Sequence, residues 1–189
     1  MRTPGVDETA SPRGRRSIRL KSYDYTSPGA YFVTVCAYRM QCLFATVEVG
    51  AVKLSEVGRI VEEEWLRTAK VRQGVELDTF VVMPNHVHGI LLIEGWASTG
   101  TTEWATHRVA PTRRSAGPVA GSVPAIVGQF KSAAARRINA LRGTPWAHVW
   151  QRNYYEHVIR SEIELNRVRE YIAGNPLLWS EDEYNPEPW

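Results

Sequence analysis

The sequence has little cysteine and no long run of hydrophobic residues. Only Cys36 and Cys42 occur among its 189 residues, which is too few for a four-cysteine zinc site or a disulfide framework. The longest apolar runs, around residues 80–83 and 89–93, are far too short to cross a bilayer. The N-terminal segment MRTPGVDETASPRGRRS lacks the apolar core of a secretory signal. We therefore expect a cytoplasmic protein with reduced thiols and no membrane partner.

Acidic residues are missing from a long central stretch. Between Trp104 and Tyr155 there is no Asp or Glu, against seven Arg and one Lys. Residues 1–21 carry six basic and two acidic side chains, although the net charge of the whole chain is only +3. Charge segregated in this way indicates a polyanionic partner, but Arg-rich solvated loops would give the same pattern.

The chain length suits one domain with some additions. Residues 1–20 are rich in Pro, Ser, Gly and Arg and are predicted to form a flexible basic arm. Residues 95–122 have a similar composition and are too long for an ordinary connector, so we expect a flexible insertion. The domain itself is predicted to span residues 21–178, and residues 179–189 form an acidic C-terminal tail.

Strands and helices are mixed along the chain. Alternating or β-branched runs predict strands at 31–38, 47–54, 76–83, 86–93 and 154–159. Helical spacing of apolar residues predicts helices from Ser55 onward, over 124–141, and from a capping box at Ser161 and Glu164 to a stop before Pro176. This order predicts an α+β fold in which a mostly antiparallel sheet carries helices on one face.

Two histidines lie one strand step apart in the sequence MPNHVHG. Because residues i and i+2 of a strand point to the same face, His86 and His88 should lie side by side, with Val87 on the other face. Two imidazoles placed in this way can bind one metal ion, although two hydrogen-bonded histidines in a hairpin would give the same pattern. A histidine-triad nucleotide hydrolase would need a third histidine at position 90, which is Ile, and there is no His-Glu-x-x-His motif.

A tyrosine and an asparagine lie four residues apart near the end of the last predicted helix. Tyr171 and Asn175 therefore share a face, next to an apolar stripe of Leu165, Val168 and Ile172. The hydroxyl and the amide would lie at the rim of the core, where they could face a site. A tyrosine that caps the core and an asparagine that ends the helix is the alternative interpretation.

Aromatic and cationic residues interleave over 149–160 (VWQRNYYEHVIR). Proteins that hold single-stranded nucleic acid combine stacking and phosphate contacts in this way, but edge strands often have the same composition.

Taken together and in this order, VVMPNHVHGI, VWQRNYYEHVIR and REYIAGNP resemble the REP-associated tyrosine transposases. These are stand-alone relatives of the single-tyrosine HUH transposases of insertion sequences. The resemblance covers about residues 17–178 without the segment near 95–122, and it includes the stretch RRSIRLKSYDYTSPGAYFVTV. It implies a ferredoxin-like α+β sandwich, the HUH endonuclease fold.

The resemblance also implies a role for each matching residue. His86 and His88 would form the metal-binding pair, Asn175 would complete the metal site, and Tyr171 would be the nucleophile. Imidazole and amide ligands with open positions suit Mg²⁺ or Mn²⁺, and no thiolate favours zinc. Attack by Tyr171 would leave a 5′-phosphotyrosine and a free 3′-hydroxyl, so the strand could be rejoined without ATP. The sequence has no Walker-type Gly-rich Lys loop, which is consistent with a reaction that does not use ATP.

The expected function is metal-dependent cleavage and rejoining of single-stranded DNA that contains REP-like hairpins, by a bacterial, nucleoid-associated monomer or homodimer. Two alternatives stay open: a catalytically silent DNA-hairpin-binding regulator, and a metal-dependent nucleic-acid hydrolase that uses water. The intact set of His86, His88, Tyr171 and Asn175 argues against the silent regulator. The charge pattern predicts contacts with DNA from Arg15, Arg16, Arg19, Lys131, Arg136, Arg137, Arg142 and Arg152.

Overall fold

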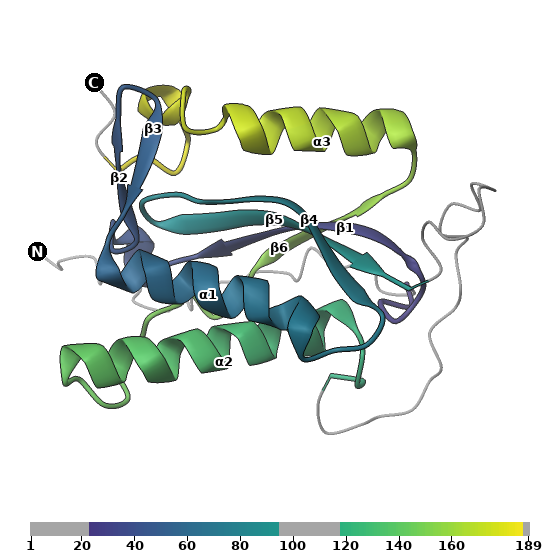
Figure 1. Cartoon of the computed structure of the whole chain (residues 1–189), viewed down its shortest axis with the longest axis horizontal. Coiled ribbons are helices and arrows are strands. Elements are labelled where there is room, and N and C mark those ends of the chain that lie inside the picture. The colour runs from purple at the N-terminus through teal and green to yellow at the C-terminus, as the bar shows by residue number, and fades with distance from the viewer. Residues whose placement is uncertain (1–22, 95–117, 187–189) are drawn as a thin grey trace, which may run out of the picture.

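Four antiparallel strands form the central sheet in the computed structural model, which describes residues 23–94 and 118–186 (Figure 1). The strands lie in the order β4-β5-β1-β6, and every neighbouring pair is antiparallel. Helices pack on this sheet, so the predicted α+β class is confirmed. The predicted basic arm and most of the predicted insertion lie outside the described residues. The four strands are β1 (Gly29–Cys36), β4 (Val75–Val82), β5 (His86–Ile93) and β6 (Tyr155–Ile159).

Helices α1 (Glu56–Lys70) and α2 (Val123–Arg142) cover one face of the sheet (Figure 1). Each begins at a serine whose side chain accepts a backbone N–H three residues later, and α2 ends at Gly143 in a left-handed conformation. Trp65 of α1 is fully buried against this face. Gly89 makes room for it, because a Cβ at that position would come within 2.4 Å of the indole ring.

Helix α3 (Glu162–Gly174) covers the opposite face, so the prediction that all helices lie on one face was wrong (Figure 1). Its residues Leu165 and Ile172 pack against Ala30, Ile90 and Ile159. The physical reason lies in the strands, which are apolar on both sides. The sequence HVHGILLI of β5 loses its alternation after the histidines, as is typical of a strand covered on both faces.

The segment predicted as one strand over residues 47–54 is a hairpin of β2 (Ala45–Glu48) and β3 (Ala51–Leu54). Val49 and Gly50 form its turn with φ values of 51° and 72°. A two-residue hairpin turn with positive φ at both positions matches the right-handed twist of the strands. Gly50 is therefore the turn signal that the strand prediction overlooked.

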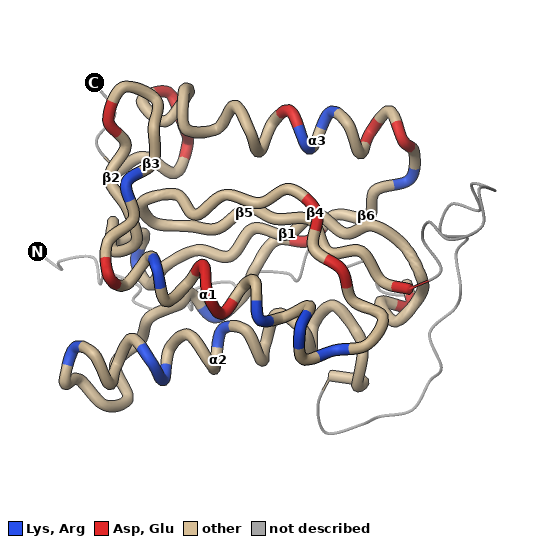
Figure 2. Tube along the Cα trace, in the orientation of Figure 1, with Lys and Arg blue, Asp and Glu red and all other residues tan. Residues whose placement is uncertain are grey.

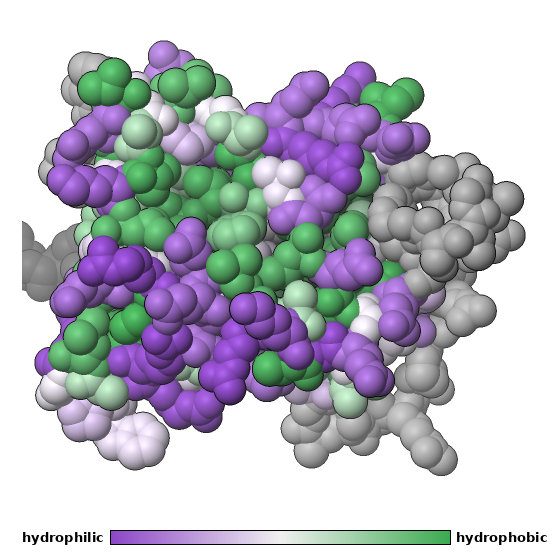
Figure 3. All heavy atoms as spheres, viewed as in Figure 1, coloured by the Kyte–Doolittle hydropathy of each residue, from purple (hydrophilic) through white to green (hydrophobic). Residues whose placement is uncertain are grey.

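The surface seen in Figure 3 is hydrophilic over α1, whereas hydrophobic residues gather in the strip between α1 and α3. Within the described residues, no helix combines the length and the hydrophobicity that a bilayer crossing requires. Two 3-10 turns, η1 (Tyr38–Met40) and η2 (Trp179–Glu181), complete the elements. Both lie in segments that contact the site described next.

Candidate active site

The two histidines of β5 lie side by side on the face that α3 covers. Their ring centroids are 4.4 Å apart, and His86 and His88 are 0% and 1% exposed. Strand β5 is paired on both sides, with β1 and with β4, so the backbone that carries the pair is in the middle of the sheet. The prediction that the two side chains share a face is confirmed.

Helix α3 brings the predicted tyrosine and asparagine to this pair. The hydroxyl of Tyr171 lies 3.2 Å from Nε2 of His88, and its ring packs edge-on against Phe32 at 6.0 Å between centroids. Asn175 follows the last residue of α3 and is only 3% exposed, whereas Tyr171 is 46% exposed. Asn175 therefore lies in the buried part of the site, whereas Tyr171 is partly exposed to solvent.

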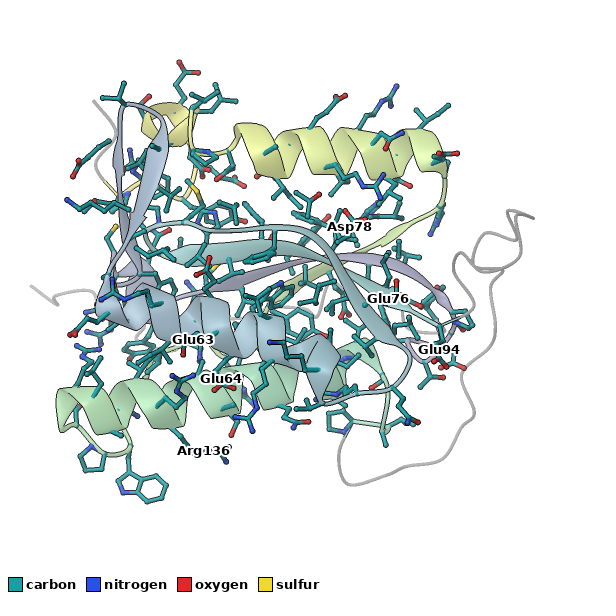
Figure 4. The ribbon with its side chains drawn as sticks, in the orientation of Figure 1. Glu63, Glu64, Glu76, Asp78, Glu94 and Arg136 are labelled. Atoms are coloured by element: carbon teal, nitrogen blue, oxygen red, sulfur yellow. The ribbon has the colours of Figure 1, made fainter. Side chains whose placement is uncertain are left out.

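An ion pair fixes α3 against the sheet. Arg169 donates from Nε to Asp78 Oδ1 at 2.9 Å and from Nη2 to Oδ2 at 2.5 Å, and Figure 4 shows Asp78 between β4 and α3. The guanidinium holds the pKa of the Asp78 carboxyl at about 2, below its usual value. Asp78 lies where the register of β4 shifts between Leu77 and Phe80, so the helix is tied to an irregular part of the edge strand.

Two buried atoms at the site have no hydrogen-bond partner within the part of the chain that the structure describes: Nε2 of His86 and Oδ1 of Asn175. A buried polar atom left unpaired is costly, and such an atom calls for an explanation. Burial lowers the pKa of His86 to about 4. Burial, together with the neighbouring His86, lowers the pKa of His88 to about 2. Both rings are therefore neutral near pH 7, which is the form that binds metal ions.

These atoms fit a divalent cation. Two imidazole nitrogens and an amide oxygen are ligands that Mg²⁺, Mn²⁺ and related ions accept. No group of three His, Cys, Asp or Glu side chains suited to a metal is found in residues 23–94 and 118–186, so the third ligand here would be the amide of Asn175. Within the described residues, Nε2 of His88 has a hydrogen-bond partner, the Tyr171 hydroxyl, whereas Nε2 of His86 has none.

Residues after α3 form part of the same site, which sequence reasoning missed. Asp182 Oδ2 accepts a hydrogen bond from Asn175 Nδ2 at 3.1 Å. The Tyr184 ring lies 4.7 Å from that of His86, and the Trp179 ring lies 6.1 Å from it. These residues fall in the segment predicted as an acidic tail. Trp179 and Tyr184 were the available signal, because segments that stay solvated contain few aromatic residues.

The Tyr171 hydroxyl is protonated at neutral pH in this environment. Burial raises its pKa, and the negative charges of Asp182 and Glu183 raise it further. A phenol is a weak nucleophile in that state. A cation beside the Tyr171 hydroxyl would oppose the effect of the two carboxylates and lower its pKa. The arrangement is therefore consistent with a site that binds a cation.

Two of the residues predicted to contact DNA have partners inside the protein. The Lys131 ammonium donates to the backbone carbonyls of Gln151, Arg152 and Asn153 at 2.6, 3.2 and 3.3 Å. Arg137 forms ion pairs with Glu63 and Glu64 of α1, at 2.5 and 2.9 Å. Lys131 thereby fixes the segment before β6, and Arg137 joins α2 to α1.

Arg136, Arg142 and Arg152 are different, because they form no ion pair or side-chain hydrogen bond within the described residues. Arg136 lines a pocket between α1 and α2 together with Arg67 and Arg72. Figure 2 shows Lys and Arg along α2 and the adjoining part of α1, on the face opposite α3. Arg15, Arg16 and Arg19 lie outside the described residues.

No protein-family model matches the chain. An uncharacterized protein of Haemophilus influenzae is 36% identical over 177 residues, which cover 89% of this chain and 92% of that protein. The two chains belong to one family.

The solved structure of a REP-associated tyrosine transposase bound to a REP hairpin has a TM-score of 0.51 and 17% identity, over 89% of this chain and 77% of that one. The chain thus has the fold of that transposase, and the resemblance seen in the sequence is confirmed at the level of the fold. A second solved structure, from Deinococcus radiodurans, is 23% identical over 82% of this chain and 95% of that one, with a TM-score of 0.42. That similarity is too low to support an argument.

Proposed function

We propose that the protein is a metal-dependent, single-tyrosine transposase that cuts and rejoins single-stranded DNA containing REP-like hairpins. The observation that carries this proposal is the position of the Tyr171 hydroxyl, 3.2 Å from His88 Nε2, beside atoms of His86 and Asn175 that have no partner among the described residues. The transposase fold supports it, since the structure with that fold was solved bound to a REP hairpin.

In this proposal His86, His88 and Asn175 hold Mg²⁺ or Mn²⁺. An ion held there would supply positive charge that stabilises the charge developing on the scissile phosphate during attack. Asp182 lies against Asn175, and its carboxylate adds negative charge to a set of otherwise neutral ligands. Tyr171 contacts the histidine of its own chain, so one chain contains all the proposed groups. We therefore propose action in cis, by a monomer or within each subunit of a homodimer.

The proposed step is a transesterification. The Tyr171 oxygen forms a bond to phosphorus while the bond from phosphorus to the 3′-oxygen breaks. The hydroxyl proton is transferred, overall, to the leaving 3′-oxygen. The products are a 5′-phosphotyrosine and a free 3′-hydroxyl, and attack by a 3′-hydroxyl on that linkage reverses the step without ATP. Exposure of Tyr171 on one side allows a strand to reach it.

We also propose that the strand is held through its phosphates by Arg136, Arg142 and Arg152, and by Arg15, Arg16 and Arg19 of the basic segment. Phosphate contacts position a strand without reading its sequence. Lys131 and Arg137 would contribute less, because their charges already have partners.

The experiment is a covalent-adduct assay with a 3′-end-labelled hairpin oligonucleotide and Mn²⁺, because the 3′ label stays on the fragment joined to tyrosine. Tyr171→Phe should lose the adduct and keep DNA binding. Tyr184→Phe is the matched control, since its ring also lies against His86, and Tyr155→Phe is a second control. Both should form the adduct, and EDTA should abolish it.

The same assay separates the other functions. Cleavage without any adduct would indicate a hydrolase that uses water. Hairpin binding without cleavage would indicate a silent regulator. An adduct that survives in Tyr171→Phe and disappears in Tyr184→Phe would show that the nucleophile is assigned to the wrong residue.

A further inference from the structure

Asn85 occupies the turn between β4 and β5, directly before His86, and is fully buried. Turn residues normally lie at the surface, where water satisfies their polar groups. Asparagine is favoured in turns because it tolerates positive φ, but the non-glycine residues with positive φ in the described chain are Arg39, Met40, Val49 and Trp146. The backbone therefore does not require asparagine at position 85, and its side chain needs another explanation.

The contacts of the Asn85 amide fix which way it points. Its Nδ2 donates to the backbone carbonyl of Met40 at 3.2 Å and to that of Tyr184 at 2.6 Å. Carbonyl oxygens can only accept, so the atom that faces them must be the NH₂ group. The remaining atom, Oδ1, then faces Nδ1 of His86 at 2.9 Å.

The orientation of this amide determines the tautomer of His86. Oδ1 can only accept, so Nδ1 of His86 must carry the hydrogen. Its Nε2 then bears an electron pair, and this is the buried atom that has no partner within the described residues. The second histidine lacks this constraint, because the Thr34 hydroxyl 2.8 Å from Nδ1 of His88 can either donate or accept.

The carbonyl of Met40 reaches Asn85 from a strained segment. Arg39 and Met40 have φ values of 55° and 57°, in the left-handed region that is unfavourable for residues with a side chain. Strain of this kind persists where surrounding contacts enforce it, often at functional sites. The second carbonyl comes from Tyr184, 99 residues along the chain. Two distant segments thus converge on one amide.

We propose that Asn85 is a positioning residue that fixes His86 as the Nδ1–H tautomer and presents the Nε2 electron pair to the metal ion. This inference rests on the metal site of the proposed function. Partners of this kind, one step behind a metal ligand, orient the ring and set its basicity.

The first test is nitrogen NMR of the metal-free full-length protein, which shows which ring nitrogen of His86 carries the hydrogen. The wild type should carry it on Nδ1. Asn85→Leu removes the acceptor and should move a large part of the population to the Nε2–H form. Asn85→Asp keeps an acceptor but loses both donated hydrogen bonds, so it should restore the Nδ1–H form. Thr34→Val, which removes the corresponding contact to His88, should leave His86 unchanged.

A purely structural role for Asn85 would predict a different pattern, in which Asn85→Asp is as disruptive as Asn85→Leu and neither changes the tautomer. An Nε2–H form in the wild type would overturn the proposal at once. If Asn85→Leu does not fold, the NMR spectra of the wild type and of Asn85→Asp still test the proposal, because it requires the Nδ1–H form of His86 in both.

The second test is Mn²⁺ titration. Asn85→Leu should bind Mn²⁺ roughly 10- to 100-fold more weakly than the wild type, whereas Asn85→Asp and Thr34→Val should lose less. His86→Ala separates the two proposals. If the wild type and His86→Ala bind Mn²⁺ equally, the proposed metal site is wrong. The NMR experiment would still show whether Asn85 sets the tautomer of His86.

Discussion

The two faces of the central sheet differ in what they bury. The face under α1 and α2 buries a large cluster of aromatic and branched residues, including Trp65, Phe130 and Trp150. The face under α3 buries a small apolar cluster and, at the other end of the same strands, His86, His88 and Asn175. One face thus supplies most of the hydrophobic stabilisation, and the other contains the candidate active site.

This difference suggests how a small domain tolerates unpaired polar atoms in its interior. A buried atom without a partner costs about 1–3 kcal/mol, and the α3 face contains Nε2 of His86 and Oδ1 of Asn175. A large apolar core on the other side of the same strands can offset such a cost. Three experiments would test this comparison.

The largest effect is expected from Trp65→Ala. This side chain is fully buried and contacts the ring of Phe130, so its loss should lower the free energy of unfolding by about 3–5 kcal/mol. Ile172→Ala, on the α3 face, should cost less, nearer 2 kcal/mol. Urea unfolding measures both, with the exposed Ile163→Ala as the control. A greater loss in Ile172→Ala than in Trp65→Ala would reverse the comparison.

The second effect is acid destabilisation of the α3 face. The pKa of His86 is lowered from 6.5 to about 4 and that of His88 to about 2, so below pH 6.5 the unfolded chain binds protons that the folded chain does not. The stability contributed by the neutral rings is complete above pH 6.5 and is lost as the pH falls toward 4 for His86. Each ring should contribute about 2 kcal/mol of this loss between pH 7 and pH 5.

Chemical unfolding of the metal-free protein at both pH values measures this loss. His86→Gln and His88→Gln should each remove about half of the pH dependence, because glutamine does not titrate. A wild-type stability that stays constant between pH 7 and pH 5 would mean that the histidines are not held neutral by burial.

The smallest effect concerns the charges on α2. Arg136 lines the pocket between the helices without an ion pair in the described chain, whereas its neighbour Arg137 is paired with Glu63 and Glu64. Arg136→Ala should flatten the plot of log K for hairpin DNA against log salt concentration by about 0.7 to 0.9, the value for one phosphate contact. Arg137→Ala should change the slope less. Equal slopes for both variants and the wild type would show that DNA does not bind this face.

Much of the fold was predictable because it follows from repeating patterns. Period-two alternation predicted the strand with His86 and His88 on one face, and helical spacing predicted the stripe of Leu165 and Ile172 that directs α3 onto the sheet. Serine residues marked where α1 and α3 begin, and the cap of α2 at Ser122 is seen only in the structure. The side of the sheet that α3 covers was not predictable in this way. When a strand is apolar on both faces, its sequence does not indicate which helix covers which face.

The outer part of the candidate site was not predictable for a different reason. Tyr184 lies against His86 and bonds Asn85, 99 residues earlier, and Asp182 bonds Asn175. Contacts of this kind leave no periodic trace in the sequence. Asparagine is common in turns, so its presence at position 85 does not by itself indicate a role for the side chain. The roles of Lys131 and Arg137 were hidden likewise, since their partners lie on other elements.

The hydrogen bond from Asn85 to Tyr184 joins residues 99 positions apart, and this has a consequence during translation. A ribosome finishes the His86–His88 hairpin long before it adds Tyr171, and Tyr184 is added later still. A nascent chain that has folded its first strands therefore lacks the proposed nucleophile, Tyr171, and the contacts that Tyr184 makes with Asn85 and His86. Under the proposed function, a copy whose synthesis stopped before Tyr171 would have no tyrosine at this position to form the covalent bond to DNA, although it already contained both histidines.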